Sequence, residues 1–407
     1  MTVTLSNEKI HCKNAIITQT PGVKHFYKIF SYAGGTNFEG QWNKCSTGFN
    51  SFFRKRNHFK PFIVRIFVAS ENQDEFTERK SFILKSYPDW EFPFSVLSQS
   101  PAFPYLVMIE AGFTDKRQTS IVYAKDSLLH LCRLSSGTYS EAWIAGAYGF
   151  IARDDTQENA KRAFNGIQLA LESVEMGFDQ VVRQWNYIEN IHHFRIKNGH
   201  QYQNYQLFNE VRGNYYSQTP MPDGYPAATG TGTFFSGITI ECMAVSTDNK
   251  GLKIVPVGNP QQRHAYKYEQ SVLRGEPAVQ HHTNQVPLFE RAKLVTDGQN
   301  SVIYVSGTAS IKGQETVGPD DPEQQTLVSI GNIETLTCKQ NLLAHCPDLK
   351  VIPDNYSYIR VYVKNKENLS LIRKICTSHF GNIPASYVIA DICRDDLLVE
   401  IEAEKSS

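Results

Sequence analysis

The sequence has no excess of charge of either sign. Lysine plus arginine and aspartate plus glutamate both number 41, which gives a formal net charge of zero. A nucleic-acid binder that depends on bulk positive charge is therefore not expected. The chain also has no apolar run approaching the length of a membrane span, so we expect no membrane segment. No basic region leads into an apolar stretch at the N-terminus, so we expect no secretory signal and a cytoplasmic protein.

Paired cysteines and metal-ligand motifs are also missing. The eight cysteines are scattered without a C-x-x-C pair, which in a chain without a signal predicts reduced thiols. The pairs His192-His193 and His281-His282 have no carboxylate or cysteine at metal-ligand spacing, so we predict no metal site. The segment 225–237 is rich in glycine and threonine but lacks the spacing and the lysine of a phosphate loop. We therefore expect no nucleotide and no cofactor.

The chain does contain a weak internal repeat. Its 407 residues, 41% of them hydrophobic, exceed one ordinary core and favour two domains or a duplicated one. A helix opens at Asp155, with Gly177 as its expected C-terminal cap, and a strand follows at 181–188. The same pattern returns with a helix from 320–322 and a strand at 358–363. Two such units can match by chance, but we interpret the match as a duplication.

The repeat aligns two Arg-x-aromatic pairs. Superposing the two strands places Arg183 on Arg360 and Trp185 on Tyr362. In the second half, the expected order is β-α-β-α-β-β, which predicts a sheet with helices on one face. The fold class predicted is α+β, with two units that each have a mixed sheet and helices on one face. We place the domains at 1–200 and 201–407.

Two segments are less clear in the sequence. Residues 202–224 are polar, aromatic and punctuated by Gly and Pro, which predicts a crossover or pocket-lining loop. Residues 1–150 show short β-rich runs and no usable motif.

The last predicted strand carries the most informative carboxylate. Alternation along this strand puts Leu398, Glu400, Glu402 and Glu404 on one face. Burial of Glu400 beside Leu398 would raise the pKa of its carboxyl toward the range of a general acid. The alternative is a solvated face at the end of the chain, which we favour for Glu402 and Glu404.

Four blocks together resemble a known family. They are Arg183-Gln-Trp-Asn-Tyr-Ile188, Pro226-Ala-Ala-Thr-Gly-Thr-Gly232, Tyr304-Val-Ser-Gly-Thr-Ala-Ser-Ile311, and Val361-Tyr-Val363 running to Asp391-Ile-Cys-Arg-Asp-Asp-Leu-Leu-Val-Glu-Ile-Glu402. In these blocks the chain resembles the chorismatases, whose C-terminal half is similar to the small YjgF-type imine deaminases. The resemblance covers residues from about Asp155 to the end. It implies two YjgF-like (chorismate-mutase-like) units, an active site in the cleft between them, and cofactor-free hydrolysis of chorismate with release of pyruvate.

The resemblance also implies site residues. Glu400 matches the catalytic glutamate of the family. Arginines and tyrosines would bind the substrate carboxylates, and a surface ion pair is the alternative for each arginine. These candidates are Arg212 and Tyr216, which we favour, together with Arg183, Tyr187, Arg360 and Arg373. After Gly232 the family carries Ala or Gly, so Thr233 is expected to narrow the pocket.

Cys393 bears on the product. Chorismatases with Ala at this position tend to give a dihydrodiol acid, and those with Cys tend to give 3-hydroxybenzoate, so the resemblance favours 3-hydroxybenzoate. A small buried thiol that only fills space is the alternative. The expected ligand is chorismate or a similar dicarboxylate, bound by a monomer or homotrimer. A YjgF-type imine deaminase, a chorismatase-like enzyme with another substrate, and a non-catalytic binding protein are the competing hypotheses.

Overall fold

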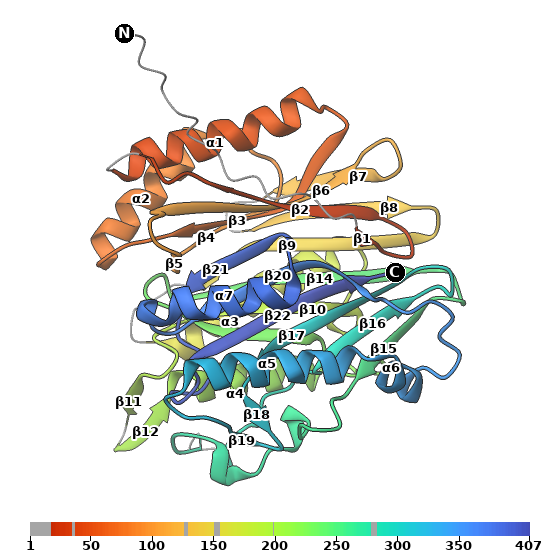
Figure 1. Ribbon diagram of the computed structural model, residues 1–407. Helices are drawn as coiled ribbons and strands as arrows, with labels where there is room; N and C mark the ends of the chain where they lie inside the picture. The colour runs from red at the N-terminus through yellow and green to blue at the C-terminus, as the bar shows by residue number, and fades with distance from the viewer. Residues whose placement is uncertain (1–17, 35–36, 126–128, 150–154, 198, 278–282) are drawn as a thin grey trace.

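Three large mixed β-sheets organise the chain, each with helices on one face (Figure 1). The computed structural model describes residues 18–34, 37–125, 129–149, 155–197, 199–277 and 283–407. We refer to residues 18–115, 120–247 and 253–407 as the first, second and third units. The α+β class with mixed sheets and helices on one face is confirmed. Among the described helices, none is both long and apolar enough to cross a lipid bilayer.

The first unit has the strand order β1-β2-β6-β3-β4. Its strands are β1 (Thr18–Gln19), β2 (Lys24–Ser31), β3 (Phe59–Val68), β4 (Phe94–Leu97) and β6 (Val107–Asp115). Its helices are α1 (Phe38–Lys55) and α2 (Gln73–Ser86). The sequence had given no architecture for this region.

The second unit has the strand order β13-β10-β14-β9-β8-β7. Its strands are β7 (Ser120–Lys125), β8 (His130–Ser136), β9 (Tyr139–Gly149), β10 (Val181–Glu189), β13 (Ala227–Thr233) and β14 (Ile238–Thr247). Its helices are α3 (Thr156–Glu172) and α4 (Asn204–Tyr216), and a hairpin of β11 (Phe194–Lys197) and β12 (His200–Gln203) precedes α4. A division at residue 200 would separate hydrogen-bonded strands of this sheet.

The third unit has the strand order β15-β16-β17-β22-β20-β21-β5. Its strands are β15 (Lys253–Val257), β16 (Ala292–Thr296), β17 (Ser301–Ala309), β20 (Asn355–Val363), β21 (Ala385–Ile389) and β22 (Val399–Ser406). The edge strand β5 (Ser100–Pro101) comes from the first unit. The helices are α5 (Pro322–Thr337), α6 (Lys339–His345) and α7 (Leu369–Phe380), and β18 (Ile311–Lys312) and β19 (Glu315–Thr316) form a hairpin.

The three units share one order of elements. Each contains β-α-β-α-β-β, its last strand lies between the first and second, and its second and third strands are parallel. The predicted repeat therefore corresponds to the second and third units, with β10 equivalent to β20. A third copy is present in the first unit, where β3 carries Arg65 and Phe67 at the positions of the other two Arg-x-aromatic pairs.

Helix caps follow the sequence signals in part. Asp155 accepts a hydrogen bond from Glu158 N, and Asp321 accepts one from Gln324 N, so both predicted N-termini are confirmed. The C-terminal cap predicted at Gly177 is wrong, because α3 already ends at Glu172 and the positive φ occurs at Glu175. Gly177 has extended backbone instead.

The loop predicted at 202–224 is also corrected, because α4 occupies much of it. Within α4, Phe208 and Val211 are buried in the core between this helix, α3 and the second sheet. Two features of α4 weaken it as an isolated helix: its N-cap residue makes no side-chain capping hydrogen bond, and Gly213 lies inside it. The packing of its apolar side chains therefore stabilises it. The second expectation for the segment, that it lines a pocket, is met by α4 as described below.

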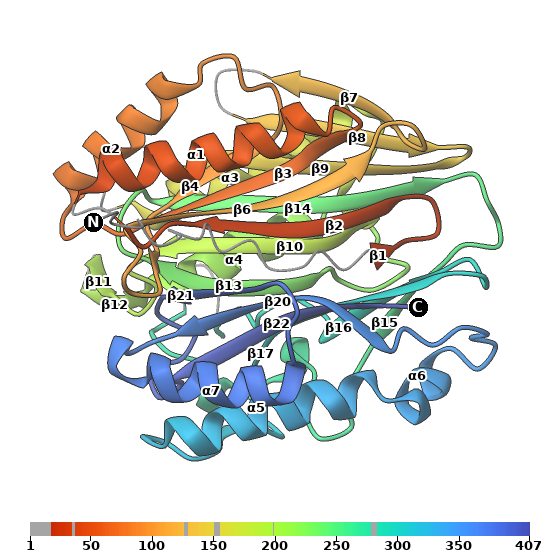
Figure 2. The same ribbon diagram turned by 45° about the horizontal axis from the view of Figure 1, so that its top comes forward.

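The helix-free faces of the three sheets meet at the centre of the molecule. Figure 2 shows α1 and α2 on the opposite side of the sheets from α5 and α7. One hydrophobic core draws residues from all three sheets, including Phe67, Trp185 and Tyr362, while a separate core lies under the helices of each unit. The functional groups described next lie where these inner faces adjoin.

Candidate active site

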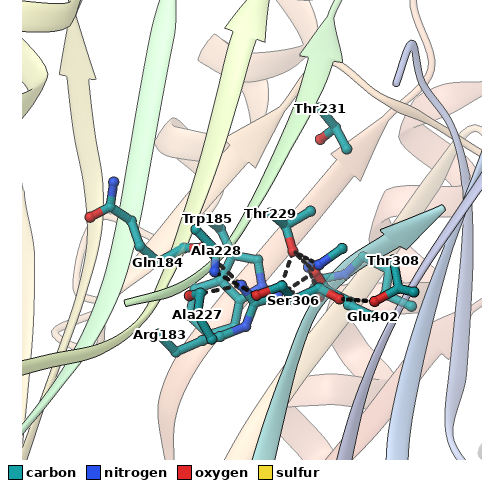
Figure 3. A network of polar contacts seen from close by, with 12 residues as sticks. Arg183, Gln184, Trp185, Ala227, Ala228, Thr229, Thr231, Ser306, Thr308 and Glu402 are labelled. Carbon is teal, nitrogen blue, oxygen red and sulfur yellow. Dashed lines mark hydrogen bonds and ion pairs between the residues drawn. The ribbon is translucent and has the colours of Figure 1, made fainter. Parts of the chain in front are cut away.

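The site lies where the second unit joins the third. Strand β13 runs beside β17: Ala228 N donates to Ser306 Oγ at 2.9 Å, and Gly307 N donates to Thr229 Oγ1 at 3.0 Å. Figure 3 shows these contacts continuing to Arg183 on β10 and Glu402 on β22. The junction is therefore held by hydrogen bonds between strands of different sheets.

A pocket opens at this junction, with about 800 Å³ of empty space including its mouth. It is bounded by α4, β13, β17, the start of β22 and the segment between β15 and β17. Its lining includes Gln203, Tyr205, Gln206, Asn209, Arg212, Ala228, Gly230, Tyr268, Val272, Leu273, Arg274, Pro287, Phe289, Arg291, Gly307, Ala309, Ile311, Cys393, Arg394 and Glu400. Arginines and aromatic rings on an otherwise largely apolar wall are typical of a small-molecule site.

Glu400 is the acidic group of this pocket. The residue is 4% exposed, and its Oε1 has no hydrogen-bond partner among the described residues. Burial raises the pKa of the carboxyl to about 8, the negative charge of Glu402 adds to the rise, and Arg183 and Arg291 oppose it. Glu400 is therefore a protonated, uncharged acid near neutral pH.

Gly307 on β17 makes room for this carboxyl. A Cβ built on Gly307 would lie 2.6 Å from Glu400 Cδ and 3.0 Å from Thr229 Cγ2. The first distance is shorter than real Cβ atoms show and the second is tight, so a side chain at position 307 would displace the Glu400 carboxyl.

Glu402 has the opposite protonation state. Burial alone would raise the pKa of its carboxyl, but Arg360 and Arg183 outweigh burial and lower it. Arg360 Nη1 lies 2.7 Å and Arg183 Nη2 2.8 Å from this carboxylate, and Thr229 Oγ1 donates to it at 2.6 Å. Glu402 is thus a fixed anion beneath the pocket floor.

A buried cluster of alternating charges extends from Glu402 through all three units. Its members, in order of contact, are Arg183, Glu402, Arg360, Glu110, Arg65 and Glu241. We call this the central charge cluster. Each of its residues is at most 4% exposed, and its three arginines balance its three glutamates. Buried charges of this kind require such partners.

Three arginines of the pocket retain unused donors. Arg212 Nε, Arg291 Nε and Arg394 Nη2 are buried, and none meets a hydrogen-bond acceptor in the described residues. Other hydrogen bonds hold two of these arginines in place. Arg212 Nη2 donates to Asn209 Oδ1, and Arg291 Nη2 donates to Tyr268 Oη, both at 2.7 Å. Buried donors without acceptors around one pocket indicate a site for an anionic ligand.

Only three of the residues predicted from the sequence line this pocket: Glu400, Cys393 and Arg212. Burial raises the pKa of the Cys393 thiol to about 12, and the nearby Glu400 adds to the rise. The thiol is therefore neutral, and it packs beside Ile392 and Leu397. This environment suits a wall of the pocket rather than a nucleophile.

Arg183, Arg360 and Tyr216 are turned to other partners. Arg183 and Arg360 belong to the central charge cluster and support Glu402 instead of lining the pocket. Tyr216 Oη donates to Gln184 Oε1 at 2.7 Å, and its ring stacks on Tyr225. Tyr216 is thus part of the core under α4.

The other four candidates also lie elsewhere. Tyr187 is buried in the central core, and Arg373 lines a different pocket. Gly232 N donates to Asp391 O at 2.7 Å, and a Cβ at Gly232 would lie 2.8 Å from Asp391 Cβ, so the two backbones approach closely. Thr233 is opposite Glu189 in the sheet and does not narrow the pocket, because the chain leaves toward the first unit, where Phe234 N donates to Ser98 O.

Sequence reasoning missed Arg291, Arg394 and Tyr205 of this pocket. Arg291 directly precedes β16, and Arg394 follows Cys393 in a turn, so neither belongs to a periodic pattern. Tyr205 lies in the segment predicted as pocket-lining, which was the one available signal. No cluster of three or more potential metal ligands occurs among the residues that the structure describes, and His281 and His282 lie outside them.

Comparisons with known proteins find similarity to chorismatases. The family model described as "Chorismatase FkbO/Hyg5-like, N-terminal" matches residues 111–244. A 3-hydroxybenzoate synthase from Streptomyces hygroscopicus is 33% identical over 234 residues, which are 56% of this chain and 64% of that protein. A chorismatase from Streptomyces rapamycinicus is 30% identical over 231 residues, again 56% of this chain and 64% of that protein. The chain thus spans just under two thirds of the length of these curated relatives.

The fold comparison covers more of the chain. A crystal structure of a chorismatase superposes with a TM-score of 0.66 at 18% identity, over 96% of this chain and 100% of that one. A Rid-family protein, YyfA from Yersinia pestis, matches 29% of this chain and 87% of its own at a TM-score of 0.23 and 21% identity. Over part of its length the chain is therefore similar to proteins of the chorismatase FkbO/Hyg5-like family, and its fold is similar to that of a chorismatase.

Proposed function

We propose that this protein removes pyruvate from chorismate by general acid catalysis at Glu400. The observation that carries the proposal is a buried carboxyl, neutral near pH 7, in a pocket whose arginines have unused donors. The names of the relatives agree with this chemistry.

The acid has a defined task on such a substrate. Chorismate carries an enol ether, and delivery of the Glu400 proton to its methylene carbon gives an oxocarbenium-like centre at the ether carbon. The C–O bond to the ring then becomes labile, and the carboxylate left on Glu400 is reprotonated for the next turnover. Proton transfer of this kind typically contributes about 10²–10⁴-fold to rate.

The arginines of the pocket suit the two carboxylates of chorismate. Arg212 and Arg291 reach the pocket from different elements, one from α4 and one from the segment preceding β16, and Arg394 follows Cys393 in the chain. Each can donate to a carboxylate oxygen, with a charge-assisted hydrogen bond. Two separated anionic groups would fix the ring with its side chain toward Glu400.

We further propose 3-hydroxybenzoate as the ring product. If water attacks, chorismate plus one water gives pyruvate and a dihydrodiol acid. If the ring hydroxyl of the substrate displaces the side chain instead, pyruvate leaves and the ring aromatises without net uptake of water. Cys393 on the pocket wall, apolar and neutral, favours the second course because it leaves less room for an attacking water.

The experiment is incubation of the purified protein with chorismate. Pyruvate is measured with a coupled lactate dehydrogenase assay, and the ring product is identified by chromatography. The reaction as written requires no metal or cofactor, so turnover should survive exhaustive dialysis against EDTA. Absence of pyruvate release from folded protein would overturn the proposed function.

A further inference from the structure

Each pair of neighbouring units forms a cleft at a corresponding place in the fold. The candidate active site occupies one of these clefts, and a second cleft also contains a pocket. The candidate active-site pocket lies between α4 and β13 of the second unit and β17 and β22 of the third. The corresponding cleft lies between α7 and β21 of the third unit and β2 and β6 of the first, and it contains a pocket of about 720 Å³ including its mouth. Its lining consists of Ile29, Ser31, Ala102, Tyr105, Met108, Arg373, Ala385 and Tyr387.

Strand register shows that these residues occupy the positions of the active-site residues. Tyr362 lies opposite Glu400 in the third unit, and Phe67, its counterpart on β3, lies opposite Met108. Ala309 pairs with Glu400, and Ser31 pairs with Met108. Met108 therefore stands where the acid stands in the candidate active site. This second pocket lies at the equivalent position of the fold and has a methionine in place of the proton donor.

The second pocket keeps a cation on the corresponding helix. Arg373 lies on α7, as Arg212 lies on α4, and its guanidinium is 5.0 Å from the centroid of the Tyr387 ring. Arg373 Nε is buried, and no acceptor meets it in the described part of the chain. This donor is available to an anionic ligand.

The remaining cleft is arranged differently. Between the first and second units, Tyr148 Oη accepts from Val96 N at 3.2 Å, and Lys80 Nζ lies 4.1 Å from the Tyr148 ring centroid. Glu241, at the position of Glu400, is paired with Arg65 at 2.6 Å. The residue at the position of Glu400 therefore has different surroundings in these two clefts: Glu241 is paired with Arg65, whereas Met108 lines the pocket of Arg373.

We propose that the pocket of Arg373 is a second ligand site, which binds a small aromatic monocarboxylate and does not transform it. Its one arginine matches one carboxylate, whereas the active-site pocket has several. The Tyr387 ring and the apolar walls of Ile29, Met108 and Ala385 suit an aromatic ring, and the Ser31 and Tyr105 hydroxyls suit a polar substituent. Met108 carries no proton to donate, so the ligand leaves unchanged.

The test uses 3-fluorobenzoate as the probe, with the full-length protein and fluorine NMR titration. Arg373→Met should weaken one binding event by about tenfold or more, because it removes the charge-assisted hydrogen bond. The matched variant Arg212→Met, on the corresponding helix, should leave that event intact. Ala385→Phe, which fills the hollow and keeps the arginine, should abolish the same event.

Three outcomes would overturn the proposal. The first is that wild-type protein binds the probe in one event that Arg212→Met removes. The second is that Arg373→Met binds like wild type, and the third is that Ala385→Phe leaves all binding unchanged while still folded. The measurement is independent of turnover, so failure of the proposed reaction on chorismate would leave this result as it is.

Discussion

Glu400 and Glu402 lie two residues apart on the same face of β22 and have opposite protonation states. Burial raises the pKa of Glu400 to about 8, whereas Arg360 and Arg183 overcome burial at Glu402 and lower its pKa. The anion at Glu402 in turn makes ionisation of Glu400 harder. An acid and a fixed anion at successive inward positions of one strand divide the roles of proton donor and electrostatic support.

Glu400→Gln should lower pyruvate release from chorismate by about 10²–10⁴-fold, because the amide keeps the shape but delivers no proton. Wild-type turnover should fall as pH rises through about 8, where Glu400 ionises. The control is Glu315→Gln, on the exposed β18–β19 hairpin, which should behave as wild type. Near-normal turnover in Glu400→Gln would remove Glu400 from the mechanism.

The raised pKa of Glu400 should make the free energy of unfolding fall as pH rises from about 4.5 to about 8. Below about pH 4.5, the model-compound value, both folded and unfolded chains keep the Glu400 proton; between 4.5 and about 8 only the folded chain keeps it, so stability falls as pH rises. The loss is complete above the folded pKa and amounts to up to about 5 kcal/mol for the rise from 4.5 to about 8. Glu400→Gln should therefore gain stability over wild type from pH 5 to about pH 8.5, measured by urea unfolding. A constant difference across this range would contradict the raised pKa.

Gly307→Ala tests the space around the acid. The new Cβ would displace the Glu400 carboxyl, and misplacement of a reacting group by about 1 Å can cost 10²-fold in rate. The control is Gly331→Ala on α5, where an added Cβ meets no atom within 4 Å and should stabilise the helix by about 0.5–1 kcal/mol. Pyruvate release and thermal unfolding are measured for both. Full activity in Gly307→Ala would show that the carboxyl tolerates the added methyl group.

Glu110→Gln should destabilise the fold strongly. Glu110 joins Arg65 of the first unit to Arg360 of the third, so its loss leaves two buried guanidinium groups short of a counter-charge. Breaking a buried pair costs about 3–5 kcal/mol, against about 0–1 kcal/mol for the exposed Glu158–Lys161 pair, tested as Glu158→Gln. Urea unfolding of both variants measures the difference. Equal small losses would show that the central charge cluster is dispensable.

Cys393→Ala should change the ring product. Removing the sulfur widens the pocket beside Glu400 and admits water, so the share of dihydrodiol acid should rise and that of 3-hydroxybenzoate should fall. Chromatography of the products with both proteins measures the ratio. An unchanged ratio, or a wild type that forms only the diol, would leave Cys393 as packing alone.

The sequence repeat could be detected in two units because their helices have clear N-caps and periodic apolar faces. The first unit escaped detection although Arg65 and Phe67 repeat the Arg-x-aromatic pair of β10 and β20. Its β3 is buried on both faces over most of its length, so it shows a continuous apolar run rather than alternation. A search for the Arg-x-aromatic pair itself would have found it.

The site was predictable where it follows strand periodicity, as at Glu400. Whether Arg183 and Arg360 bind a ligand or an internal carboxylate depends on the side chains that neighbouring units place opposite them. The residue pattern of a single strand does not contain that information. Arg183 meets Glu402 from 219 residues away, and Arg360 meets Glu110 from 250 residues away. Arg291 and Arg394 come from irregular segments, where the chain path alone decides which side chains reach the pocket.

The covalent linkage of three similar units has a consequence for how the clefts can change. In an assembly of three identical chains, one substitution alters every cleft at once, and an acid lost from one is lost from all. Here Glu400, Met108 and Glu241 occupy one equivalent position in three separately encoded strands. Each cleft can therefore acquire its own chemistry, while the shared arginines and glutamates at the centre constrain all three to keep the same geometry.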